Sequence, residues 1–259
     1  LVMNGRGPAR PHEFFVLKNH AASSRSALAR HFRGELRSLV HGESANQGIK
    51  ARNKEQRFAL EILLNDQIRV ATLVGRAGTG KTLLAIAVGL EKVMEQKNYS
   101  RLLITRPVIP LGNDLGFLPG SKEEKLRPWM QPIYDNLEFI FSGNPEPHRI
   151  IEHLVDRGIL EMEALAYIRG RSIPRQFIIC DEAQNLTPHM IKTLITRVGE
   201  GTKIVFTGDP EQIDHPYLDA SSNGLTYLVE HLKDEEIAGH VTLFKGERSA
   251  VAEMGARLL

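Results

Sequence analysis

Eight consecutive residues, Gly75-Arg76-Ala77-Gly78-Thr79-Gly80-Lys81-Thr82, combine the residue types that a phosphate-binding loop requires. Glycines allow the backbone to curl so that consecutive N–H groups point at phosphate oxygens. Lys81 can then reach the β- and γ-phosphates, and the Thr82 hydroxyl can ligate Mg²⁺. An apolar run, Val70 to Val74, precedes the loop and a helical pattern follows it. The spacing predicts ATP binding with Mg²⁺, and a glycine-rich turn with a chance Lys-Thr pair is the alternative.

Two acidic residues follow the apolar run Phe177 to Cys180, where a buried strand is expected to end. Ligands of open α/β sheets bind at the carboxyl ends of the strands, so these carboxylates should face the phosphate loop. Asp181 would hold Mg²⁺ together with Thr82. Glu182 would take a proton from the attacking water. An ordinary strand end is the alternative interpretation.

Three further side chains could contact the nucleotide. Gln212 could sense hydrolysis at the γ-phosphate, or belong to a simple turn built by Gly208 and Pro210. Gln56 could read the adenine edge with its paired donor and acceptor, or face solvent in the first turn of a helix. Arg248 could reach the γ-phosphate as an arginine finger, in its own subunit or a neighbour's, or lie on the surface near a helix N-terminus.

Short apolar runs that alternate with helical patterns must position these side chains. The expected strands lie at 14–17, 70–74, 102–104, 177–180, 204–206 and 241–244, and the expected helices at 56–64, 82–94, 150–155, 187–199, 225–232 and 249–259. Residues 107–128 contain four prolines and are expected to be irregular. The alternation predicts an α/β fold with a mainly parallel sheet flanked by helices on both faces.

The first 50 residues differ from the rest of the chain. Residues 1–60 hold eleven Lys and Arg against four Asp and Glu, although the net charge of the whole chain is only +2. We expect a basic, strand-containing appendage at 1–50 and a P-loop ATPase domain at 51–259. A basic arm can attract nucleic acid, but a solvated linker explains the charge equally well. No apolar stretch is long enough to span a membrane, and the cytoplasm is the expected location.

Together these motifs resemble the PhoH family of P-loop ATPases, and within it the branch called PhoH2. The resemblance runs from about residue 50 to the end of the chain. The segments that carry it are Arg52 to Gln56, Gly75 to Thr82, Thr105 to Pro107, Leu115 to Lys125, Pro128-Trp129, Ile168 to Arg171, Asp181 to Gln184 and Glu247 to Ser249. It implies a RecA-like core similar to that of superfamily-one helicases.

The resemblance also implies roles for individual residues. It places six side chains around the nucleotide, namely Gln56, Asp181, Glu182, Gln184, Asp209 and Gln212. Arg106 corresponds to a region that in helicases faces phosphate or nucleic acid, and Lys125 and Arg171 are weaker candidates for RNA contact. The function implied is Mg²⁺-dependent ATP hydrolysis coupled to binding, remodelling or unwinding of single-stranded RNA.

Other interpretations stay open at this point. A regulatory ATPase could control an attached or partner nuclease without unwinding RNA, and a nucleotide-gated binding module could turn over negligibly. A P-loop kinase would need an acceptor site that we do not find. PhoH2 proteins carry a PIN nuclease domain ahead of the ATPase and are associated with toxin–antitoxin systems, and PhoH-type domains resemble ring-forming hexamers. Because residues 1–50 contain only three acidic side chains, a PIN domain is expected before Leu1. A single core is expected to need adjacent subunits for unwinding.

Overall fold

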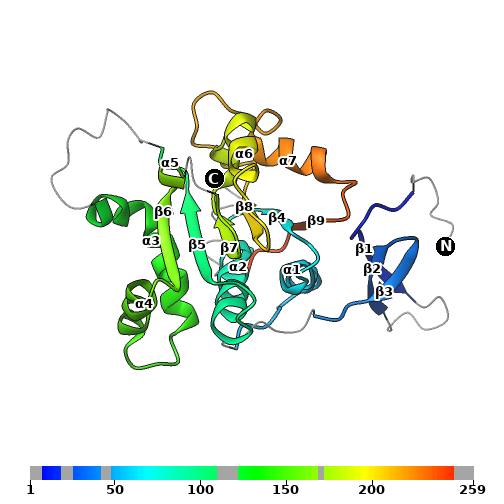
Figure 1. Cartoon of the computed structure of the whole chain (residues 1–259). Helices are drawn as coiled ribbons and strands as arrows, with labels where there is room; N and C mark the ends of the chain where they lie inside the picture. Colours follow the sequence, from blue (N-terminus) through cyan, green and yellow to red (C-terminus); the bar gives the residue numbers. More distant parts are fainter. Residues whose placement is uncertain (1–7, 19–25, 42–47, 110–121, 169–171, 248–259) are drawn as a thin grey trace.

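A computed structural model of the chain describes residues 8–18, 26–41, 48–109, 122–168 and 172–247 (Figure 1). The strands are β1 (Phe14–Lys18), β2 (Ser26–Phe32), β3 (Glu35–Ser38), β4 (Val70–Gly75), β5 (Arg101–Arg106), β6 (Leu160–Ala164), β7 (Gln176–Cys180), β8 (Lys203–Gly208) and β9 (Ala238–Leu243). The helices are α1 (Lys54–Leu64), α2 (Lys81–Leu90), α3 (Lys122–Ile140), α4 (Pro147–Asp156), α5 (Leu165–Ile168), α6 (Pro188–Ile195) and α7 (Gly224–Leu232), with a π-helical segment at Glu91–Glu95 and a 3-10 segment at Ala183–Asn185.

Six parallel strands form the central sheet, in the order β6-β5-β7-β8-β4-β9. One apolar cluster contains buried residues of α1, α2, α3 and α4, and a second contains those of α5, α6 and α7. Helices therefore cover both faces of the sheet, which explains why its central strands are apolar throughout. The expected α/β core with a mainly parallel sheet flanked by helices is confirmed.

The short strands β1, β2 and β3 form a separate antiparallel sheet that packs against α1, seen at the right of Figure 1. The ring of Phe14 stacks on that of Phe58, with 4.4 Å between the ring centroids. Arg30 forms a buried ion pair with Glu61 of α1. The carboxylate of Glu61 also accepts hydrogen bonds from the main-chain N–H groups of Val40 and His41. The predicted strand-containing N-terminal appendage is confirmed.

The structure differs from the sequence prediction between β5 and β7. Residues 122–128 are helical, because α3 extends through Pro128 and Pro132. Both prolines are exposed, whereas Met130, Ile133 and Leu137 are buried at helical spacing, so packing of the apolar face offsets the lost hydrogen bonds. Strand β6 was not expected at all. Its sequence, Leu-Glu-Met-Glu-Ala, has apolar and charged residues in alternation, typical of the edge position that β6 occupies.

Two smaller differences concern the ends of elements. Strand β9 begins at Ala238 rather than at residue 241, and Phe244 lies beyond it with its side chain exposed. Helix α6 is capped by Thr187 as expected, but it ends at Ile195 rather than at residue 199. The predicted final helix at 249–259 lies outside the described residues. None of the described helices combines the length and the apolar character needed to cross a membrane.

Candidate nucleotide site

The phosphate loop connects the end of β4 to the start of α2. Gly78 and Gly80 have φ values of 82° and 89°, in the left-handed region that glycine adopts without strain. Gly75 is required for a different reason, since a Cβ atom there would overlap the carbonyl oxygen of Leu243 in β9. The loop thus presents main-chain N–H groups and the positive end of the α2 dipole to one side of a cavity.

This cavity has a volume of about 350 Å³. Residues 77–78 and 80–83 of the phosphate loop and α2 form one wall, and Glu182 with Gly208, Asp209 and Gln212 forms another. Pro132 and Asn136 of α3 complete the lining. The predicted Lys81, Glu182, Asp209 and Gln212, which come from three separate parts of the chain, therefore border one space.

Asp181 lies in direct contact with the phosphate-loop helix. Its Oδ1 atom accepts hydrogen bonds from the Thr82 hydroxyl at 2.8 Å and from the Thr207 hydroxyl at 2.5 Å. A hydroxyl and a carboxylate are oxygen ligands of the kind that Mg²⁺ prefers, alongside phosphate oxygens and water. No group of three or more His, Cys, Asp or Glu side chains that could hold a metal occurs among the described residues. The donor set therefore fits a magnesium ion that the nucleotide helps to hold.

Glu182 has a strained backbone, with φ 55° and ψ 39°. Its Oε2 atom accepts a hydrogen bond from Nε2 of Gln184 at 2.5 Å, and its Oε1 atom lies 3.3 Å from Nη2 of Arg106. Burial, followed by the negative charge of Asp181, raises the pKa of the Glu182 carboxyl above its ordinary value. A carboxylate with a raised pKa that borders the cavity suits the role of general base.

Gln184 joins two segments of the site instead of leaving its amide free. Besides its bond to Glu182, Nε2 donates to the carbonyl oxygen of Gln212 at 2.9 Å, and Oε1 accepts from the N–H of Asp209 at 3.1 Å. The carboxylate of Asp209 in turn accepts from the N–H of Ala77 in the phosphate loop. The 208–212 segment is therefore connected both to the proposed base and to the phosphate loop.

The side chain of Lys81 is turned back on its own loop. Its Nζ atom donates to the carbonyl oxygens of Gly75 at 2.5 Å and Arg76 at 2.9 Å. Arg76 points to the surface and forms an exposed ion pair with Glu211. The predicted contact of Lys81 with phosphate oxygens would therefore require Nζ to leave these loop carbonyls.

The predicted adenine contact, Gln56, is buried against the phosphate loop. Its Nε2 atom donates to the carbonyl oxygen of Thr79, and its Oε1 atom accepts from the N–H of Arg52. Asn53, which caps α1, donates to the carboxylate of Glu247, and the N–H of Glu247 donates to the Gly78 carbonyl. Gln56 is not among the residues that line the cavity, and its adenine role stays a prediction.

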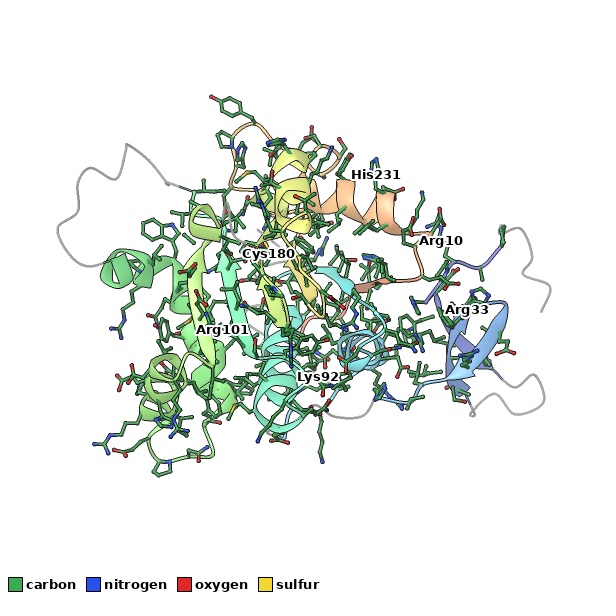
Figure 2. The ribbon with its side chains drawn as sticks, viewed as in Figure 1. Arg10, Arg33, Lys92, Arg101, Cys180 and His231 are labelled. Atoms are coloured by element: carbon green, nitrogen blue, oxygen red, sulfur yellow. The ribbon has the colours of Figure 1, made fainter. Side chains whose placement is uncertain are left out.

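Arg106 lies at the end of β5, beside the acidic end of β7, which Cys180 marks in Figure 2. Its Nε atom is 3.3 Å from Oδ2 of Asp181, and Nη1 donates to the carbonyl oxygen of Trp129 at 2.6 Å. Sequence reasoning missed this contact and the role of Thr207, although a threonine at the end of a buried apolar strand was an available signal. Arg248 and Arg171, and the side chain of Lys125, lie outside the described residues.

A larger cavity, of about 620 Å³, lies between the appendage, the first residues of β4 and β9, and the end of α7. It is at the opposite ends of these strands from the phosphate loop. Its charged side chains include Arg10 and Lys233, which pair with Asp234 and Glu230. It lacks the curled glycine loop and helix N-terminus found at the smaller cavity, which is therefore the candidate nucleotide site.

Comparison with known proteins shows which family the chain resembles. The model of the family described as PhoH-like protein matches residues 48–253. Protein PhoH2 of Bacillus subtilis (strain 168) is 53% identical over 251 residues, covering 96% of this chain and 57% of that protein. Protein PhoH2 of Thermobispora bispora is 38% identical over 235 residues, covering 90% of this chain and 52% of that protein. The chain thus spans somewhat more than half the length of these two relatives.

Solved structures resemble the chain more distantly. The SWI2/SNF2 ATPase core of Sulfolobus solfataricus, solved in complex with dsDNA, covers 80% of this chain and 47% of its own, with a TM-score of 0.45 and 13% identity. The Pif1 helicase from Candida albicans covers 76% of this chain and 40% of its own, with a TM-score of 0.37 and 16% identity.

Proposed function

The chain belongs to the PhoH family, and from that premise we propose that it hydrolyses ATP with Mg²⁺ and couples the reaction to binding, remodelling or unwinding of RNA. The observation that carries the proposal is the 2.8 Å hydrogen bond from Thr82 to Asp181. It joins the helix that starts at the phosphate loop to the acidic strand end, and Glu182 borders the same cavity.

Binding would begin at the phosphate loop. Main-chain N–H groups at the start of α2 would donate to the phosphate oxygens, and Lys81 would leave the loop carbonyls to contact the β- and γ-phosphates. Thr82 and Asp181 would hold the metal between them. When bound, Mg²⁺ would supply positive charge that offsets the charge developing on the phosphate oxygens.

Hydrolysis would then depend on how Glu182 is held. Its carboxylate would orient the attacking water and accept its proton. Gln184 fixes that carboxylate and contacts the backbone of Asp209 and Gln212, so a change at the γ-phosphate could be transmitted through this connection. Arg248 of the same or an adjacent subunit would contribute as an arginine finger.

The RNA component of the proposal follows from the family resemblance. Single-stranded RNA would bind near Arg106, which the resemblance matches to a region that faces phosphate or nucleic acid in helicases. A homo-oligomeric ring would bring a second subunit face to each nucleotide, and an upstream PIN domain would supply nuclease chemistry. These two features and the cytoplasmic location remain predictions.

The test is ATP turnover measured with and without single-stranded RNA, on particles whose mass in solution is known. We expect Mg²⁺-dependent release of phosphate that RNA stimulates. A turnover rate that is the same with and without RNA would instead favour an ATPase that regulates an attached nuclease. The absence of any turnover, with nucleotide bound, would contradict the hydrolytic function itself.

A further inference from the structure

The guanidinium of Arg106 contacts three groups from two other parts of the chain. Nε lies 3.3 Å from Asp181, Nη2 lies 3.3 Å from Glu182, and Nη1 donates to the carbonyl oxygen of Trp129 in α3. The Arg106 side chain is only 14% exposed, so solvent screens these contacts weakly. A planar guanidinium can serve three acceptors at once because its N–H donors point in fixed, divergent directions.

The sheet explains why this arginine is placed so accurately. Thr105 of β5 pairs with Cys180 of β7, so Arg106 and Asp181 are the next residues on two adjacent parallel strands. The N–H of Asp181 also donates to the carbonyl oxygen of Thr105 at 2.9 Å. The pairing of β5 and β7 therefore sets the contact between Arg106 and Asp181, whereas the carbonyl of Trp129 belongs to α3.

Helix α3 forms part of the wall of the candidate nucleotide cavity. Pro132 and Asn136 line the cavity one and two turns beyond Trp129. The carbonyl of Trp129 is thus a fixed point through which Arg106 ties the position of α3 to the two carboxylates. A change in the charge around Asp181 and Glu182 would therefore act, through Arg106, on the part of the cavity wall that α3 forms.

From this geometry we infer that Arg106 is a positioning residue for α3, and that its contact with Asp181 is given up when the metal binds there. Its guanidinium offsets the charges of Asp181 and Glu182 and holds the Trp129 carbonyl. A magnesium ion beside Asp181 would repel the guanidinium, so metal binding and the Arg106–Asp181 contact oppose each other. Arrival of the metal would loosen Arg106 and allow α3 to move. This inference rests on the proposed function of the site.

The chain contains its own reporter for the test. Trp129 is the single tryptophan of the sequence and is half-buried, so its fluorescence reports the position of α3. We would record its emission in the full chain with adenylyl imidodiphosphate, with and without Mg²⁺. Calorimetry would give the Kd of the nucleotide under both conditions. We expect the emission to change only when metal and nucleotide are both present.

Three variants separate the outcomes. In Arg106→Ala the fluorescence change should disappear, and the Kd ratio without and with Mg²⁺ should rise about tenfold because a competing close charge is lost. Arg106→Lys keeps the charge but not the fork of donors, so it should keep the Kd ratio within about twofold while losing the fluorescence change. Arg101→Ala, at the other end of β5 where Arg101 pairs with Glu161, should behave as the parent (Figure 2).

The results would distinguish this inference from the function on which it rests. If the parent chain binds no nucleotide in calorimetry, the proposed ATPase function fails and the inference fails with it. If nucleotide binds but Arg106→Ala keeps both the fluorescence change and the parental Kd ratio, only the exchange of Arg106 with the metal is overturned.

Discussion

The Thr82 hydroxyl and the Asp181 carboxylate are hydrogen-bonded across 2.8 Å although 99 positions separate them in the chain. This bond brings together the two sequence motifs on which the candidate site depends. Thr207 donates to the same oxygen from the strand between them, β8. Asp181 is thereby held by hydroxyls from two elements, which is the kind of preorganisation that the proposed metal-assisted phosphoryl transfer requires.

Loss of the phosphate-loop lysine should abolish hydrolysis without unfolding the chain. In Lys81→Ala we expect kcat to fall by about 10²–10³, because a cation aimed at transition-state charge is removed. Phosphate release in a steady-state assay measures this, and thermal melting checks the fold. The matched control is Lys192→Ala, which alters an exposed lysine on α6 and should retain parental turnover. Parental turnover in Lys81→Ala would disprove the assignment of the site.

Replacing the proposed base should separate binding from hydrolysis. Glu182→Gln keeps the size of the side chain and removes its basicity, so turnover should fall by about 10²–10⁴ while the Kd of ATP changes little. Single-turnover hydrolysis and calorimetry measure the two quantities. A loss of turnover matched by an equal loss of affinity would show that Glu182 serves binding rather than proton transfer.

The anchor between the appendage and the core should carry substantial stability. Glu61→Ala leaves the buried Arg30 without its carboxylate partner and removes the acceptor of two main-chain N–H groups, for an expected loss of about 3–5 kcal/mol in the free energy of unfolding. Urea denaturation measures the loss. Glu35→Ala, which breaks an exposed pair with Arg37, should cost less than about 1 kcal/mol. Equal losses in the two variants would contradict the structure of this contact.

Acid should destabilise the fold through His240. Its ring nitrogens are hydrogen-bonded to the hydroxyls of Thr72 and Thr242, and burial lowers the pKa of His240 to about 4. The His240 ring therefore takes up a proton near pH 6.5 in the unfolded chain, but only near pH 4 in the folded chain. Stability is therefore complete above pH 6.5 and decreases as the pH falls towards 4, by about 2 kcal/mol at pH 5.

The variant His240→Gln tests this dependence. It should lose about 1 kcal/mol at pH 8, where only hydrogen bonds differ, and should show a smaller decrease in stability between pH 6.5 and pH 5 than the parent. Denaturant titrations at the three pH values give both differences. An unchanged pH dependence in His240→Gln would mean that other groups cause the acid sensitivity.

Local sequence signals predicted the phosphate loop, the acidic strand end and five of the six described strands of the central sheet, because each depends on a short run of residues with its own chemistry. The contacts of Arg106 were out of reach, since they depend on the order of β5 and β7 in the sheet. Helix α3 was missed because its prolines indicate irregular structure when the sequence is considered alone. In the fold, burial of its apolar face offsets the hydrogen bonds that Pro128 and Pro132 remove. The bond between Gln184 and the 208–212 segment likewise exists only once two strand ends meet.

The hydrogen bond between Asn53 and Glu247 has a consequence for how the domain responds to ligand. These residues stand at the two extremities of the nucleotide-binding region, and Glu247 also touches Gly78. The chain between residues 53 and 247 is consequently closed by a contact beside the phosphate loop. ATP bound at the phosphate loop would stabilise the folded state that contains this contact. Proteolysis should therefore slow together at the segments around Asn53 and Glu247 whenever ATP is bound.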